Sequence, residues 1–86
     1  MRGATRLGQD SAGGVLISGS PDVFVNGSNQ VRIGDLVAGH GTGEHSGPVM
    51  VTGSPDVIVN GISSCRTGDL ASCGHPSSGS ADVFIN

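Results

Sequence analysis

The chain is short, poor in charge and almost free of aromatic side chains. Its 86 residues include four Lys and Arg, seven Asp and Glu and two Phe, and the hydrophobic share is 35%. A formal net charge of −3 with so few cations provides no phosphate-binding surface, which argues against nucleic acid or an anionic membrane as a stable partner. No apolar run approaches the roughly 18 to 20 residues that span a bilayer, and no signal peptide is recognised. We expect one small soluble domain, residues 1–86, with a thin core and an additional staple.

Two repeated elements run along the chain. The first reads Gly-Ser-Pro-Asp-Val-Phe-Val-Asn at 19–26, and recurs with small changes at 53–60 and 79–86. It is β-branched, and its first two copies run into Asn-Gly, the pair that favours a type I′ turn. The second element begins with arginine, as Arg-Leu-Gly at 6–8, Arg-Ile-Gly-Asp-Leu at 32–36 and Arg-Thr-Gly-Asp-Leu at 66–70. Each pair of elements predicts a β-hairpin.

The copies are circularly permuted, because the first arginine element has no strand before it and the last strand has no arm after it. We therefore predict an all-β fold of three hairpins, from 20–36, from 54–70, and from 80–86 completed by 1–8. The hairpins are expected to close around a pseudo-threefold axis, which also protects the sheet edges. Strand alternation assigns one apolar layer to the equivalent residues Phe24, Ile58 and Phe84, with the flanking Val and Ile residues facing the opposite way.

The recurring polar residues are interpreted as structural. We expect each repeated arginine to bind the neighbouring aspartate or backbone carbonyls; these are Arg6, Arg32 and Arg66. The Gly-Asp pairs are interpreted as turns in which the aspartate bonds its own backbone two residues on. The first copy reads Gly-Gln-Asp at 8–10, so its turn is expected to differ in detail.

All three histidines and one of the two cysteines lie outside the repeated elements. The basic period is 26 residues, and eight extra residues fall between 35 and 53, around His40 and His45. Cys73 and His75 lie in the equivalent segment of the third copy. One thiolate and three imidazoles make a complete tetrahedral zinc set. The alternative is that these are surface histidines on glycine-rich loops, with Cys73 an idle thiol or a disulfide partner of Cys65.

Of the two possible staples, zinc is the stronger. A disulfide between Cys65 and Cys73 would close a loop of about eight residues and contribute about 2–3 kcal/mol, whereas structural zinc contributes about 10–16 kcal/mol in finger peptides. Zinc would also join two distant segments. Cys65 is explained without metal, because it is equivalent to Thr5 and Val31 and packs as a small hydrophobe.

This order of elements resembles the PAAR-repeat proteins, named for Pro-Ala-Ala-Arg followed by a Gly-Asp turn. The corresponding positions read Gly-Ala-Thr-Arg at 3–6, Asn-Gln-Val-Arg at 29–32 and Ser-Ser-Cys-Arg at 63–66, so the arginine matches everywhere and the proline nowhere. The segment Gly-Ser-Pro-x-Val-x-x-x-Gly, also typical of the family, matches at 19–27 and 53–61. The resemblance covers nearly the whole chain.

The resemblance implies a conical spike tip that caps a trimeric β-helical spike, in a type VI secretion system (the valine-glycine repeat protein) or in a contractile phage tail. One copy per trimer is expected, with effector cargo as a further possible partner and only transient contact with the target membrane during piercing. The protein is expected to be cytoplasmic before assembly, and then to be secreted by the injection apparatus or to sit at the virion tail tip.

The resemblance also implies a structural zinc near the apex, bound here by His40, His45, Cys73 and His75. Many members carry another histidine in copy one, where this chain reads Ser-Ala-Gly-Gly at 11–14, so the ligands must come from copies two and three. No enzymatic activity is implied.

Two other functions are compatible with the same residues. A small zinc hydrolase would use three protein ligands and a metal-bound water, which requires an open coordination position and a pocket. A metal-independent structural cap would lose no thermal stability on replacement of Cys73 by serine.

Overall fold

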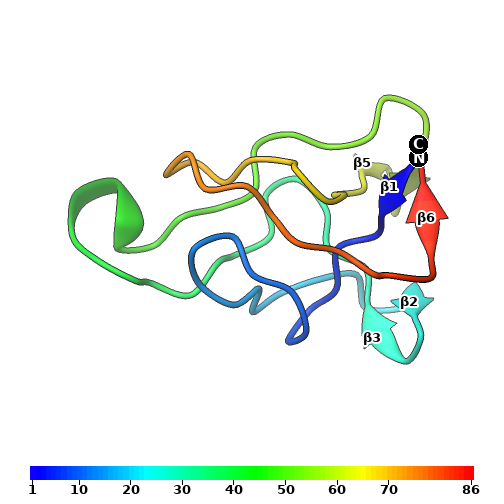
Figure 1. The fold of residues 1–86 in the computed structure, drawn as a ribbon, viewed down its shortest axis with the longest axis horizontal. Coiled ribbons are helices and arrows are strands. Elements are labelled where there is room, and N and C mark those ends of the chain that lie inside the picture. Colours follow the sequence, from blue (N-terminus) through cyan, green and yellow to red (C-terminus); the bar gives the residue numbers. More distant parts are fainter.

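The computed structural model describes all 86 residues and confirms the all-β class. The regular elements are β1 (Arg2–Gly3), β2 (Phe24–Val25), β3 (Ser28–Asn29), the 3-10 helix η1 (Gly43–His45), β4 (Ile58–Val59), β5 (Ile62–Ser63) and β6 (Phe84–Ile85). The molecule measures 32 × 23 × 23 Å. The strands and both chain termini gather at one end of the long axis, and η1 lies at the other end (Figure 1). No helix is long and apolar enough to span a bilayer.

Three antiparallel two-stranded sheets, β2–β3, β4–β5 and β1–β6, lie within the predicted hairpin ranges. The prediction that the arginine elements are the returning strands is wrong, because the strands pair with the residues just before the arginine elements, and the arginine elements bridge to other copies instead. The pairing of β6 with β1 confirms that the third hairpin is assembled from the two ends of the chain. Both Asn-Gly turns have positive φ at their two central residues, 50° and 84° at Asn26 and Gly27, and 55° and 77° at Asn60 and Gly61. These angles confirm the type I′ geometry, which glycine adopts without strain.

The arms that follow the hairpin turns meet in a closed ring of backbone hydrogen bonds. The N–H of Thr5 donates to the carbonyl of Cys65 (3.1 Å), Cys65 donates to Val31 (2.8 Å), and Val31 donates back to Thr5 (3.0 Å). These residues occupy the same position in the three copies, so each copy is bonded to both others. The ring agrees with the predicted threefold order, while the conical outline stays a prediction.

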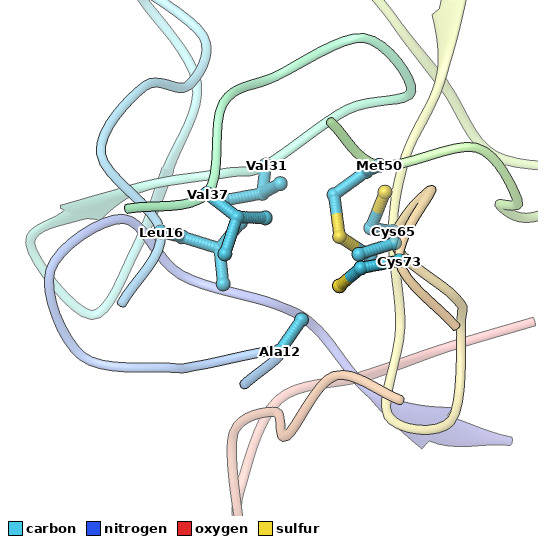
Figure 2. Packing of buried hydrophobic residues seen from close by; sticks show 8 residues of the cluster. Ala12, Leu16, Val31, Val37, Met50, Cys65 and Cys73 are labelled. Carbon is cyan, nitrogen blue, oxygen red and sulfur yellow. The ribbon is translucent and has the colours of Figure 1, made fainter. Parts of the chain in front are cut away.

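The core contains eight buried residues, two of which, Val31 and Cys65, belong to this ring. They are Ala12, Leu16, Val31, Val37, Met50, Cys65, Ala71 and Cys73. Figure 2 shows Met50, Cys65 and Cys73 grouped on one side of the cluster, with Leu16, Val31 and Val37 facing them. The core is thus thin, as predicted, and includes both cysteines.

The predicted apolar layer of Phe24, Ile58 and Phe84 is wrong. These side chains are 57%, 54% and 49% exposed, whereas the adjacent Val25 and Val59 are buried. The reason is the position of the hairpins, which form one end of the molecule and therefore have a protein neighbour on one face only (Figure 1). Val25 and Val59 take the inward face, and the repeated large residues point outward.

Each copy contains one arginine–aspartate ion pair, as predicted for the arginines. The Nε–Oδ2 distances are 2.8 Å for Arg6–Asp10, 3.1 Å for Arg32–Asp35 and 2.9 Å for Arg66–Asp69. The expectation that each aspartate bonds the backbone two residues on is wrong. The carboxylate instead accepts the backbone N–H of its own arginine partner, three or four residues earlier, at 2.7–2.8 Å, because the ion pair holds it over the start of the turn. The spacing is four residues in copy one and three elsewhere, so that turn does differ.

The ion pairs are largely shielded from solvent. Asp69 and Arg66 are both buried, with side chains 3% and 10% exposed. Burial alone would raise the pKa of Asp69, but hydrogen bonds from Arg66 and Thr52 outweigh it and hold that pKa below its ordinary value. Asp10 shows the same balance, with burial opposed by hydrogen bonds from Arg6 and Ser78 and a lowered pKa.

Candidate metal centre

Two tight loops carry the four candidate ligands, at the end of the molecule opposite the hairpin strands (Figure 1). The first loop is the predicted insertion, where the N–H of His40 donates to the carbonyl of His45 (2.9 Å) and η1 supplies His45. In the second loop, the N–H of Ala71 donates to the carbonyl of His75 (3.0 Å), which encloses Cys73. Each loop therefore holds two candidate ligands by one backbone hydrogen bond.

The fold brings all four side chains together. One ligand atom from each of His40, His45, Cys73 and His75 lies within 4.8 Å of the others. The Nδ1 atom of His45 is 3.2 Å from Nε2 of His40, and Sγ of Cys73 is 3.6 Å from the same Nε2. With zinc bond lengths of about 2.0–2.1 Å to nitrogen and about 2.3 Å to sulfur, a tetrahedral site has edges of about 3.3 Å (N to N) and about 3.6 Å (N to S). The two observed distances fit these edges.

The orientation of His40 is fixed from outside the cluster. Its Nδ1 donates a hydrogen bond to the carbonyl of Ala38 at 3.0 Å, since a carbonyl oxygen only accepts. A neutral His40 therefore presents an unprotonated Nε2 to the other three side chains. A hydrogen bond of this kind from the second ring nitrogen orients metal-binding histidines in general.

The cluster lies where the core meets the surface. Cys73 is buried and belongs to the hydrophobic core, His40 and His45 are partly buried, and His75 is exposed. The group can thus hold a metal ion with its sulfur ligand shielded from water and one imidazole edge facing outward. The molecular surface has no pocket.

Cys65 is not part of this cluster. Its thiol is fully buried and donates to the carbonyl of Thr52 at 3.4 Å. Burial, together with the nearby Asp69 and Asp35 carboxylates, raises the pKa of Cys65 to about 12, so the group is a thiol at neutral pH. Both cysteines are free in the structure, so the alternative disulfide is not formed. The interpretation of Cys65 as a packing residue is confirmed.

One neighbour of the cluster has no counterpart among the predicted site residues. Gly13, in the first copy, lies directly against the rings of His40 and His75. The sequence marked this segment only as lacking a histidine. Its signal was the Gly-Gly pair at 13–14, whose meaning depends on a close approach that the sequence does not reveal.

The fold and site define a small all-β protein of three linked hairpins with one His/Cys cluster at the end opposite the strands. Residues 8–74 of the 86 match the PAAR motif, and the chain therefore belongs to the PAAR motif family. The matched range includes His40, His45 and Cys73, and His75 follows it directly. No curated protein matches the chain.

Proposed function

We propose that the protein is the structural tip of a contractile injection apparatus, either a type VI secretion system or a phage tail. It caps a trimeric spike through its hairpin end and holds a structural zinc at the other end. The observation that carries the proposal is the placement of three equivalent hairpins and one His/Cys cluster at opposite ends of the long axis, in a member of the PAAR motif family.

The donor set favours zinc over other common ions. Calcium and magnesium take oxygen ligands, whereas three imidazoles and one thiolate suit zinc. Four protein ligands also complete a tetrahedral site, which is the pattern of a structural ion, while a zinc hydrolase keeps one position open. The ion would tie the loop of residues 40–45 to that of 73–75, and so stabilise the end of the molecule that lies opposite the hairpins.

The hairpin end has the character of a docking surface. Each hairpin exposes a large apolar side chain at an equivalent position, Phe24, Ile58 or Phe84, and the β4–β5 hairpin also exposes Ile62. Large apolar and aromatic side chains are the usual anchors of protein interfaces. A true trimer offers three equivalent sites around its axis, so one copy of this chain can engage all three subunits with like contacts.

The same end also carries most of the net charge. Three of the seven acidic residues are paired with arginines. The other four are Asp22, Asp56, Asp82 and Glu44, opposed by the remaining arginine, Arg2. The first three are one exposed aspartate per hairpin. The exposed apolar side chains fit a partner with apolar sockets, and electrostatic complementarity adds a basic rim around them, both in threefold arrangement.

Side-chain hydrogen bonds hold neighbouring hairpins together at this end. The amide of Asn26 donates to Asp82 at 2.8 Å, and the amide of Asn60 donates to Asp22 at 2.8 Å. The docking surface is thus linked from hairpin to hairpin before it meets a partner. In this proposal the protein acts mechanically and contacts the target membrane only transiently, while piercing it. It leaves the cell on the injection apparatus and can recruit an effector.

A matched pair of substitutions tests which surface docks. Ile58 and Ile17 are 54% and 53% exposed, but Ile58 lies in a hairpin strand and Ile17 lies outside the hairpins, where its N–H donates to the carbonyl of Leu36. Binding to the cognate trimeric spike is measured by co-elution in size-exclusion chromatography. Ile58→Asp is expected to abolish the complex and Ile17→Asp to preserve it. Equal loss with both variants, or loss with neither, would refute the docking surface.

A further inference from the structure

The first copy supplies no ligand, yet its backbone passes close to the cluster at Gly13. A Cβ atom added to Gly13 would lie 2.7 Å from Nε2 of His40 and 2.5 Å from Cδ2 of His75. Real Cβ atoms essentially never lie within 3.0 Å of a non-bonded heavy atom, and both distances are shorter than that. The His40 atom concerned is the nitrogen that faces the other three candidate ligands. The space beside it therefore accommodates glycine and no larger residue.

Of the two side chains beside Gly13, His40 cannot easily move aside. His40 is held through its Nδ1 by the carbonyl of Ala38. Gly14 packs against that same carbonyl, so closely that a Cβ on Gly14 would collide with it. The turn itself is closed by a hydrogen bond from the N–H of Ala12 to the carbonyl of Gly14 (2.9 Å), with Gly13 at a φ of +85°. Rotation of His40 away from a new side chain would break its bond to Ala38.

We propose that Gly13 is a positioning residue that closes the metal centre. Its bare backbone lies against the ligand nitrogen of His40 and the ring of His75, fixes both imidazoles, and leaves no room for a fifth ligand on that side. Gly13 is itself exposed, so it forms the outer wall of the site. The inference rests on the metal binding proposed above and assigns the first copy its part in the centre.

Gly13→Ala is the test, and Gly8→Ala is the matched control. Gly8 belongs to the same copy and has a similar φ of +75°, but nothing lies within 4 Å of its added Cβ. Both variants are therefore destabilised by placing an alanine in the left-handed region, but only in Gly13→Ala does the new Cβ clash with His40 and His75. Zinc affinity is measured by competition with a chromophoric chelator, and the coordination number by the visible absorption of the cobalt(II)-substituted protein.

Gly13→Ala is expected to weaken zinc binding by about 10- to 100-fold, the usual effect of disturbing residues that orient metal ligands. Its cobalt spectrum is expected to lose the intense bands of four-coordinate cobalt. Gly8→Ala is expected to match the wild type in both measurements. Wild-type affinity and spectrum in Gly13→Ala, or an equal change in Gly8→Ala, would overturn the role of Gly13.

Two further measurements separate the possible failures. Both variants are refolded in excess zinc, which favours the folded state by mass action. If Gly13→Ala still folds poorly, the drop in denaturation midpoint that it causes is measured twice, in the wild type and in a His75→Ala background. The proposal predicts a smaller drop in the His75→Ala background, and an equal drop contradicts it. A wild-type protein that binds neither metal would refute the proposed zinc site, and this inference with it, whereas tight wild-type binding with unchanged Gly13→Ala refutes this inference alone.

Discussion

Replacement of Cys73 by serine is expected to remove the stabilisation that zinc gives to the fold. Serine has nearly the same shape but is not deprotonated at neutral pH, so the cluster of His40, His45 and His75 loses its anionic ligand. An ion that binds only the folded chain, present at 1,000 times its Kd, contributes about 4.1 kcal/mol. In a domain of this size 1 kcal/mol shifts Tm by about 4–8 °C. The wild type should therefore unfold roughly 15–30 °C higher with zinc than with a chelator.

The assay is thermal unfolding followed by circular dichroism, with excess zinc and with excess chelator. The difference between the two conditions should largely disappear in Cys73→Ser. Cys65→Ser is the control, because Cys65 is equally a core cysteine but bonds the Thr52 carbonyl instead of joining the cluster. That variant should lose about 1–2 kcal/mol at any zinc concentration and keep the full zinc effect. A wild-type Tm that chelation leaves unchanged would refute the reasoning and favour a metal-independent cap.

Two further substitutions test the ion pairs and the core. Asp69→Asn should cost about 3 kcal/mol, because it leaves Arg66 without its buried partner. The pKa of Asp69 is lowered in the folded chain, so the stabilisation that Asp69 provides is complete above the unfolded carboxyl pKa and is lost as pH falls through the folded value. In urea denaturation, the difference in free energy of unfolding between wild type and Asp69→Asn should therefore narrow below about pH 4. A difference that stays constant with pH would contradict this. Leu16→Ala should cost about 2–5 kcal/mol because Leu16 is fully buried, whereas Phe84→Ala should cost about 1 kcal/mol or less. The reverse order in urea denaturation would restore Phe84 to the core.

The sequence predicted those features that depend on local chemistry and repetition. The Asn-Gly turns at 26–27 and 60–61 specify their own geometry, and the permuted copies required β6 to pair with β1, as it does. The four candidate ligands were recognisable because they fall outside the repeat, in two equivalent segments, and the structure brings these residues together.

Features that depend on how whole elements pack were not predicted correctly. Alternation along a strand separates its two faces but does not say which face is inward, and for Phe24, Ile58 and Phe84 the choice was wrong because the hairpins end the molecule. The aspartates bond the N–H of their own arginines because the ion pair, rather than the turn alone, sets their position. The role proposed for Gly13 requires knowing that a Cβ atom added there would meet His40 and His75.

Native mass spectrometry of the complex between this chain and its cognate trimeric spike tests the central claim most directly. The measured mass reports the number of chains and the bound metal together. The predicted complex contains three spike subunits, one copy of this chain and one zinc ion. Three copies per trimer, a complex without metal, or no complex at all would contradict the account of a zinc-stabilised tip seated on a trimeric spike.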